Sequence, residues 1–427
     1  MYHSNKTAWK WIPTTFFMEG LPFTMIVVVS TIMYKNFGLS NSEITFYTGW
    51  LYIPWVIKPV WAWFVDVYRT KRWWIYGMQM CLAITFVAIT FSLQTPYYFK
   101  LSIILFWLCA LFSSSHDIAA DGFYLISLSS GQQSLFVGMQ SLFYQVAKFF
   151  GSGLLVLISG FLLSKTNNNA KLSWSIVMLI VALLIFAISI YHQKTLPRDE
   201  KTSEKTISQG FNEIKHVFSE FFKLKGLWIT LIFIMTFRLG DNQVNKIVPL
   251  FLLDDRAHGG LGFDNTYVGF ANMFVLAAMI TAGVLGGITI SKFGLKKCMW
   301  YMLAFVNLPH AVYIYLAYAQ PESQVVVLCL QVIEHFSTTF SLTAYTMITF
   351  HLVKDSAYKT AHYAFISGIM VAGVMLPSMF SGAIQQALGY QHFFIYVMFT
   401  MIPSMLIMPF IKITDAYGKR VAAEEKE

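Results

Sequence analysis

Several ionisable side chains lie within stretches of the chain that are otherwise apolar. The acids are Glu19, Asp117, Asp121, Asp241 and Glu334, and the bases are Lys58, Lys148, Arg238 and Lys246. A charged group in an apolar environment is costly unless it is paired or faces water, so each is a candidate for proton transfer or ion binding. These five acids and four bases nearly cancel, which allows internal pairing and still leaves bases for an anionic solute.

Four of these acids are candidate proton carriers: Asp117, Asp121, Glu19 and Glu334. Asp117 and Asp121 are four residues apart and share one face of a helix, where two neighbouring carboxylates favour holding a proton between them. Alternatively, Asp121 caps the helix or pairs with loop arginines. Glu19 and Glu334 lie near the middle of their apolar segments. His335, a candidate for solute binding, follows Glu334, although adjacent helical residues point about 100° apart.

The basic side chains are candidates for binding a solute. Lys58, Lys148 and Lys246 could clamp a carboxylate or a phosphate, or could be counter-ions for the acids. Arg238 and Asp241 are three residues apart, so they could contact a solute or neutralise each other. We keep both alternatives for each of these residues.

The elements that must position these groups are membrane-spanning helices. The chain has 427 residues, of which 56% are hydrophobic and 12% charged, whereas a soluble domain has about 25% charged residues. A spanning helix needs roughly 20 mostly apolar residues, and such stretches recur along the whole chain. We predict an all-α integral membrane protein with twelve helices, near 9–35, 43–65, 73–94, 98–125, 132–163, 172–192, 226–253, 265–291, 297–318, 323–352, 358–387 and 391–413.

The net charge of +9 reflects lysines and arginines gathered on one side of these helices. With the N-terminus inside, the basic residues that fall outside are Lys35, Lys100, Lys165, Lys171 and Arg256. Cytoplasmic loops carry the excess of basic residues, so we expect both termini in the cytoplasm and a location in the inner membrane. Nothing before Trp9 resembles a cleavable signal. The charge therefore indicates a lipid bilayer as partner and no nucleic acid.

The longest polar stretch separates two groups of six predicted helices. We expect six-helix bundles at 1–192 and 226–413, a cytoplasmic linker at 193–225 and a cytoplasmic tail at 414–427. Within the linker, apolar residues recur at spacings of three and four, namely Ile207, Phe211, Ile214, Phe218 and Phe222. This spacing predicts an amphipathic helix along the inner leaflet, with a disordered linker as the alternative.

The two halves also contain a repeated pattern. Residues 38–44 (GLSNSEI) match residues 262–268 (GFDNTYV), and each segment is predicted to cap the second helix of its half. Thr15-Phe16 and Thr236-Phe237 begin comparable polar interruptions of the first and seventh helices. A duplicated six-helix unit is similar to the architecture of the major facilitator superfamily, whose members bind solutes near the middle of the membrane.

One cytoplasmic turn also resembles that superfamily. Residues 66–72 contain Asp66, Arg69 and Arg72, a partial match to its acidic and basic loop signature, while the equivalent turn at 291–297 lacks the acid. We therefore expect any gating salt bridge to belong to the first half.

A more specific resemblance lies in the fourth predicted helix. Residues 115–122 (SHDIAADG) resemble the S-Q-D-I-x-x-D signature of AmpG-type muropeptide permeases and of the related acetyl-coenzyme A and siderophore transporters. This resemblance implies a monomeric symporter that uses the proton gradient to import an anionic solute, such as an anhydromuropeptide or its disaccharide. His116 replaces the usual glutamine, and Asp121-Gly122 is nearer to the acetyl-coenzyme A and siderophore branches. A siderophore or a uronic-acid disaccharide is therefore an alternative solute.

Other classes of function have less support in the sequence. There is no GxxxxGK[ST], HExxH or GxSxG motif, and the cysteines, Cys81, Cys109, Cys298 and Cys329, lack metal-ligand spacing. We expect no enzyme activity, no cofactor and no metal; a membrane-embedded transferase or a non-transporting sensor are the alternatives. His310 follows Pro309 and is predicted to be a kink or packing residue.

Overall fold

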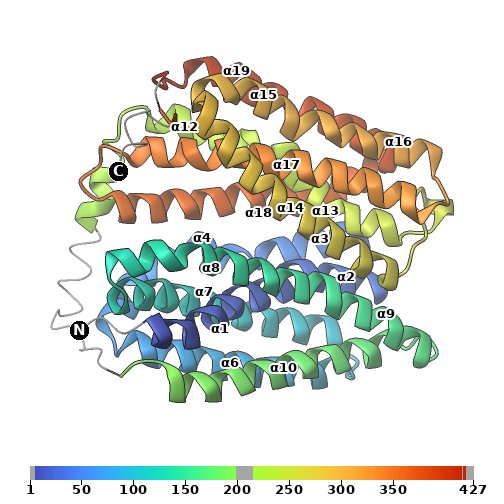
Figure 1. Ribbon diagram of the computed structural model, residues 1–427. Helices are drawn as coiled ribbons and strands as arrows, with labels where there is room; N and C mark the ends of the chain where they lie inside the picture. Colours follow the sequence, from blue (N-terminus) through green and yellow to red (C-terminus); the bar gives the residue numbers. More distant parts are fainter. Residues whose placement is uncertain (1–4, 199–214, 416, 420–427) are drawn as a thin grey trace. The chain divides into compact units, whose positions relative to one another are not determined.

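A computed structural model describes residues 5–198, 215–415 and 417–419, and within them every regular element is helical (Figure 1). The helices form two compact units. Unit 1 comprises Met1–Ser40, Tyr47–Lys215 and Asp264–Asn272, and unit 2 comprises Asn41–Phe46, His216–Phe263 and Met273–Glu427. These boundaries differ from the expected bundles, because the opening turns of the second and eighth predicted helices are each grouped with the other half of the sequence.

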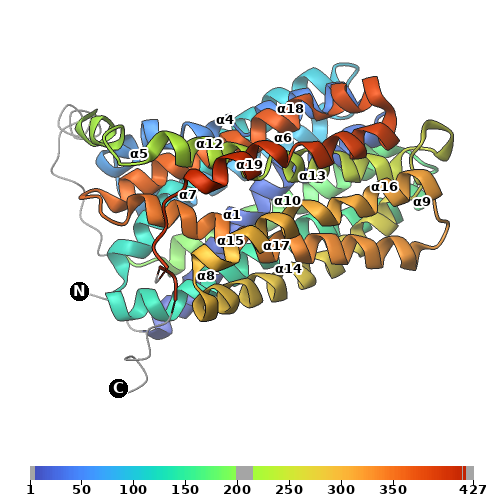
Figure 2. The same ribbon diagram turned by 90° about the horizontal axis from the view of Figure 1, so that it is seen from above.

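Unit 1 contains the helices of the first half, except that Asn41–Phe46, the start of α3, belong to unit 2. They are α1 (Asn5–Thr24), α2 (Ser30–Asn36), α3 (Asn41–Trp50), α4 (Ile53–Val56), α5 (Lys58–Val67), α6 (Lys71–Ser92), α7 (Tyr98–Ser127), α8 (Ser130–Lys148), α9 (Val156–Lys165) and α10 (Ala170–Thr195). Short π-helical stretches, Met25–Val29 and Phe149–Leu155, join α1 to α2 and α8 to α9. Helix α6 packs against both α7 and α10, and α1 packs against α8 (Figures 1 and 2).

Unit 2 contains the helices of the second half, except that the first residues of α14, up to Asn272, belong to unit 1. They are α12 (Leu227–Phe237), α13 (Leu239–Leu253), α14 (Asn265–Phe293), α15 (Leu295–Asn307), α16 (Ala311–Ala319), α17 (Gln324–Val353), α18 (Lys359–Phe399) and α19 (Ile402–Ile407). The 3-10 turns are Arg256–His258, Leu308–His310 and Met408–Phe410. Gly389 interrupts α18 with a backbone φ of 71° and ψ of 166°.

The prediction of twelve membrane-spanning helices is confirmed, although only part of it follows from helix length. Within the described residues, nine helical stretches are long and apolar enough to cross a membrane. One of them, Ala361–Phe410, has 50 residues and contains the break at Gly389, so it supplies the last two spans. The second and seventh predicted helices complete the twelve; both are broken, and neither contains a single helix of spanning length.

The two broken helices place basic residues at their breaks. Ile57 departs from helical geometry (φ −95°, ψ 4°) between Pro54 and Pro59, and Lys58 begins the next helix. Arg238 itself forms the break between α12 and α13 (φ −105°, ψ 19°), immediately after the predicted interruption at Thr236-Phe237. In contrast, α1 continues through Thr15-Phe16, and its irregular stretch is the π-helix at Met25–Val29. Irregular backbone at membrane depth is tolerated only inside protein or beside water.

The repeated sequence segments make comparable polar contacts at the starts of α3 and α14. In unit 2, Asn41 donates hydrogen bonds to Gln385 (2.8 Å) and Tyr390 (2.8 Å). In unit 1, Asn265 contacts the Asn36 carboxamide oxygen and donates to Ser159 Oγ (3.0 Å). Asp264 caps α14, because its carboxylate accepts from the backbone N–H of Tyr267 (2.9 Å).

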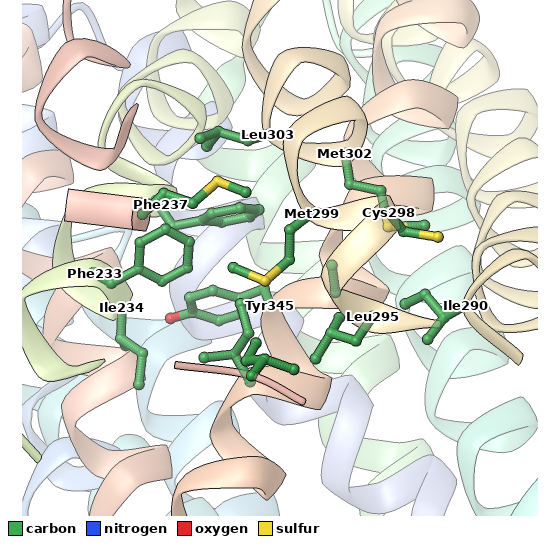
Figure 3. Packing of buried hydrophobic residues seen from close by; sticks show 14 of the residues in the cluster. Phe233, Ile234, Phe237, Ile290, Leu295, Cys298, Met299, Met302, Leu303 and Tyr345 are labelled. Atoms are coloured by element: carbon green, nitrogen blue, oxygen red, sulfur yellow. The ribbon is translucent and has the colours of Figure 1, made fainter. Parts of the chain in front are cut away.

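A buried cluster of aliphatic, aromatic and sulfur-containing side chains includes the last residue of α12, next to the break at Arg238. Phe237, the last residue of α12, stacks on Tyr345 of α17 with ring centroids 5.3 Å apart, and Met299 of α15 lies in the same buried cluster (Figure 3). Because lipid tails are as apolar as these side chains, close van der Waals packing is what stabilises the association of the helices. The end of α12 is therefore packed against α15 and α17.

The described part of the predicted amphipathic helix is residues 215–221, and Ile207, Phe211 and Ile214 lie outside the described residues. Its most buried side chain is Phe221, whereas Phe218 is 48% exposed, so the buried face is centred away from the predicted stripe. The backbone carbonyl of Val217 lies 3.0 Å from His362 Nε2, which joins this helix to the start of α18.

Candidate functional site

The structure groups the predicted charged residues into two clusters, one in each unit. The unit 1 cluster consists of Glu19 on α1, Lys58 on α5, and Asp117 and Asp121 on α7. Lys58 Nζ lies 3.7 Å from Asp121 Oδ2, and these side chains are 26% and 48% exposed. The pair is loose and accessible, so water or a solute can reach it.

Asp117 and Asp121 each have their own partner on a neighbouring helix. The indole N–H of Trp55 donates to Asp117 Oδ2 at 2.9 Å, and the Gln140 side-chain amide donates to Asp121 Oδ1 at 3.4 Å. The i, i+4 spacing keeps both carboxylates on one face of α7. Each carboxylate therefore has its own hydrogen-bond donor on a neighbouring element.

Glu19 is the most enclosed member of the unit 1 cluster. It is 8% exposed, and its Oε1 atom has no hydrogen-bond partner among the described residues. Glu19 interacts electrostatically with Asp121, Asp117 and Lys58. If all four groups were charged, three negative charges would face one positive charge, and such an excess is relieved when a carboxylate takes up a proton.

The unit 2 cluster consists of Arg238, Asp241, His310, Glu334 and His335. The Arg238 guanidinium lies 2.6 Å from Asp241 Oδ2, and the Asn245 side-chain amide donates to Asp241 Oδ1 at 2.6 Å. Asp241 is in the first turn of α13, where the helix dipole also stabilises a carboxylate. Arg238 and Asp241 therefore neutralise each other, one of the two alternatives that their spacing allowed.

Glu334 is surrounded by polar groups from three helical elements. Its Oε1 atom lies 2.9 Å from His310 Nδ1, and its Oε2 atom lies 2.6 Å from His335 Nδ1. Tyr313 and Thr338 donate hydroxyl hydrogen bonds to the same carboxylate, at 3.2 and 3.1 Å. The Glu334 side chain is only 2% exposed. A carboxylate between two imidazoles in a buried site can share a proton with either ring.

His310 is therefore more than the kink or packing residue that its neighbour Pro309 suggested. It does end a 3-10 turn, Leu308–His310, and that turn brings the ring to Glu334. Neither His310 nitrogen makes a hydrogen bond of ordinary geometry within the described residues. The ring is close enough to Glu334 for proton exchange once its orientation adjusts.

The ligand atoms of Asp241, His310 and Glu334 lie within 4.8 Å of one another, so these residues could hold a cation. The charges favour a proton over a divalent metal. Arg238 already balances Asp241, and one additional proton on His310 or His335 would balance Glu334, whereas a dication would leave an excess positive charge in a buried site.

Two predicted solute-binding lysines lie outside these groupings. Lys246 is 6% exposed on α13, five residues beyond Asp241 and hence about 140° around the helix from it. Lys148 is the last residue of α8, and its backbone carbonyl accepts from Ser152 at 2.9 Å. The spacing along α13 separates Lys246 from the face that carries Asp241.

The predicted gating loop lies between α5 and α6. The Asp66 side chain lies outside what the structure describes. Arg69 has a positive φ of 65°, and its guanidinium lies 5.8 Å from the Tyr68 ring centroid. Arg72 donates to the backbone carbonyl of Gln193 near the end of α10 (2.5 Å) and to that of Leu196 just after this helix (3.1 Å). Arg72 thus fastens this loop to the start of the linker.

Sequence reasoning missed the neutral partners of the clusters. Trp55, Gln140 and Tyr313 come from other elements, and no local pattern identifies them as neighbours of the acids. Thr338 is different, because it is four residues after Glu334 on α17 and the helical spacing could have indicated the contact.

Comparisons with known proteins agree with this arrangement. The family model described as Major Facilitator Superfamily matches residues 14–381. "Putative transporter AmpG 4" of Rickettsia conorii is 22% identical over 409 residues, covering 92% of this chain and 94% of that protein. The anhydromuropeptide permease of Escherichia coli K12 is 21% identical over 415 residues, covering 94% of this chain and 79% of the permease.

Solved structures show the same fold at low sequence identity. The nucleoside transporter NupG aligns with a TM-score of 0.71 and 13% identity, covering 96% of this chain and all of that one (100%). The D-xylose–proton symporter aligns with a TM-score of 0.70 and 14% identity, covering 98% of this chain and 100% of the symporter.

Proposed function

Because the chain belongs to the Major Facilitator Superfamily, we propose that it is a proton-coupled symporter that imports an anionic amino-sugar solute, such as an anhydromuropeptide or its disaccharide. The observation that carries this proposal is the buried Glu334 carboxylate, held between His310 and His335. The names of the relatives, which include an anhydromuropeptide permease, support the solute class.

The unit 1 cluster supplies the second part of the proposal. Glu19, Asp117 and Asp121 would take up the coupling proton, which relieves their excess negative charge over Lys58. Lys58 is the accessible base of this cluster and would attract the acidic group of the solute. Lys148, Arg238, Asp241, Lys246 and His335 remain proposed solute contacts.

We propose that the protein acts as a monomer in the inner membrane, with both termini in the cytoplasm. The distribution of basic residues along the sequence supports the orientation. The resemblance to the superfamily supports the monomer. The gating role of Asp66, Arg69 and Arg72 is proposed from the resemblance of residues 66–72 to the loop signature of the superfamily. A cysteine placed in each terminus and labelled from one side of sealed vesicles would test the orientation.

The test of coupling is uptake of labelled N-acetylglucosaminyl-anhydromuramic acid into proteoliposomes, with and without an imposed inward proton gradient. We expect accumulation that depends on the gradient, and we expect Glu334→Gln and Asp117→Asn to abolish this dependence. Asp255→Asn is the matched control, because the Asp255 side chain is 83% exposed in a loop and should leave uptake unchanged.

The outcomes separate the components of the proposal. Equal uptake with and without the gradient would refute proton coupling but keep a transporter. An absence of uptake, in liposomes shown to hold folded protein, would refute this solute, and competition with siderophores or uronic-acid disaccharides would then identify the alternative. Conversion of the solute in detergent would instead indicate a membrane-embedded transferase.

A further inference from the structure

A chain of hydrogen-bonded side chains runs through the interior of unit 1 and begins at His116, the neighbour of Asp117. The Gln79 amide nitrogen lies 2.9 Å from His116 Nε2, and the Gln79 amide oxygen lies 3.0 Å from His192 Nδ1. His192 Nε2 in turn lies 2.8 Å from the Thr14 hydroxyl. We call these four residues the polar chain. Its members come from α7, α6, α10 and α1, and His116, Gln79 and His192 are fully buried.

The amide of Gln79 determines which nitrogen of each ring carries a proton. An amide NH₂ can only donate and an amide oxygen can only accept. His116 Nε2 therefore accepts from Gln79, and His192 Nδ1 donates to it. At its other nitrogen His192 accepts from Thr14. Both rings are thus neutral, with the proton on Nδ1, because the hydrogen bond at one ring nitrogen sets the state of the other.

In this arrangement the proton of His116 is on Nδ1, the ring nitrogen near Asp117. His116 Nδ1 lies 3.9 Å from Asp117 Oδ1, and neither atom has another hydrogen-bond partner among the described residues. Asp117 Oδ2 is already fixed by Trp55. A small rotation of either side chain would close the gap to a hydrogen bond, and a buried unpaired donor and acceptor favour that rotation.

The polar chain has a second arrangement that also satisfies every member. If His116 gains a proton, its Nε2–H needs an acceptor, and a 180° rotation of the Gln79 amide supplies the oxygen. The amide NH₂ then donates to His192 Nδ1, so the His192 proton must move to Nε2, where it donates to Thr14 Oγ1. The Thr14 hydroxyl, which then no longer donates to His192, is free to donate to the Trp11 carbonyl, 3.1 Å away. One proton is taken up in total, and it stays on His116.

We propose that Gln79 is a positioning residue that sets the protonation state of His116 and thereby the hydrogen bonding of Asp117. The proposal rests on the proposed role of Asp117 in proton coupling. The ionisable groups around the polar chain are Glu19 of α1, Lys58 of α5, Asp117 and Asp121 of α7, and His192 of α10. Gln79 is neutral, so it can couple the protonation state of the His116 ring to the position of the proton on the His192 ring without adding a charge.

The test is ¹⁵N NMR of histidine-labelled protein in lipid nanodiscs, which distinguishes Nδ1–H, Nε2–H and doubly protonated rings. His116→Asn and His192→Asn assign the two signals. At neutral pH we expect the Nδ1–H form for both rings in the unchanged protein. Gln79→Glu offers an acceptor to both rings, so we expect His116 to become doubly protonated, and the pH midpoint of uptake to rise by about one unit or more.

Two further variants keep the result interpretable. Gln79→Met has a similar shape and removes both hydrogen bonds without burying a charge, so we expect a mixture of His116 forms even where Gln79→Glu fails to fold. Gln94→Glu is the matched control, because Gln94 lies just past the end of the same helix, where it donates to Ser175, and it should leave the His116 signal unchanged.

The proposal is overturned if His116 in the unchanged protein carries its proton on Nε2, or if Gln79→Glu and Gln79→Met leave the His116 signal as it was. These outcomes do not depend on transport. A failure of gradient-driven uptake with the expected NMR spectra would refute the proposed function alone.

Discussion

The two charged clusters differ in how tightly their ion pairs are closed. In unit 1, the Lys58–Asp121 distance is 3.7 Å and the Asp121 side chain is 48% exposed. In unit 2, the Arg238–Asp241 distance is 2.6 Å and Asp241 is fully buried. An accessible, loose pair can exchange partners with water or a solute at little cost, whereas a buried pair is costly to open. The comparison indicates that unit 1 is the more adaptable half.

The largest effect should follow from breaking the buried pair in unit 2. Asp241→Ala leaves the Arg238 guanidinium without this carboxylate, and removing one partner of a buried pair costs about 3–5 kcal/mol. We discount the figure toward its lower end because the Arg238 side chain is 23% exposed. Thermal unfolding in detergent would measure the loss of stability.

The matched variant is Arg238→Met combined with Asp241→Leu, which replaces both charges with apolar groups. Much of the lost stability should return in it. A double variant as unstable as Asp241→Ala would show that the ion pair itself, and not the unpaired charge, determines stability.

A smaller effect is expected where helices pack closely in unit 1, the unit with the loose ion pair. Gly20, beside Glu19, lies where a Cβ atom would come within 2.6 Å of the Tyr144 carbonyl oxygen and 2.8 Å of Ala147 Cβ. Gly20→Ala should therefore destabilise the protein by about 1–3 kcal/mol. Gly77→Ala on α6 is the control, because nothing lies within 4 Å of its Cβ position. Equal unfolding temperatures for the two variants would contradict the close packing of α1 on α8.

Removing the loose Lys58–Asp121 pair of unit 1 should reduce stability less than Asp241→Ala or Gly20→Ala does. Lys58→Met should alter the free energy of unfolding by no more than about 1 kcal/mol, because exposed ion pairs contribute little. The same variant should weaken uptake of an anionic solute, measured as a higher KM. A large loss of stability with unchanged KM would reverse the contrast between the two clusters.

The smallest effect is expected at an ion pair outside both clusters. A hydrogen bond from Lys296, at 2.9 Å, lowers the pKa of Asp415 from its ordinary value. A lowered carboxyl pKa stabilises the fold above the ordinary value and loses that contribution as the pH falls through the folded pKa. Because the Asp415 side chain is 78% exposed, Asp415→Asn should leave the unfolding temperature unchanged between pH 5 and 8.

The sequence predicted the helices and showed which charged residues lie within apolar segments, because both follow from local composition. Glu334 was recognisable as a functional candidate from its charge alone. Its neighbours were not, because His310, Tyr313 and Glu334 meet only when the 3-10 turn Leu308–His310 and α16 pack against α17. The same limit applies to Gln79 and His192, which are 113 residues apart in sequence and lie within hydrogen-bonding distance of each other.

The break at Gly389 in α18 also bears on the topology of the chain. Within the described residues, counting only the apolar helical stretches of spanning length gives nine, an odd number that would put the two ends of the chain on opposite faces of the bilayer. Once the long α18 stretch is divided and the two broken helices are included, the number is twelve, and an even number returns the chain to the face from which it started. The division of α18 at Gly389 therefore decides the parity of the protein, because the two broken helices add an even number of spans. The parity in turn determines which loops share a compartment.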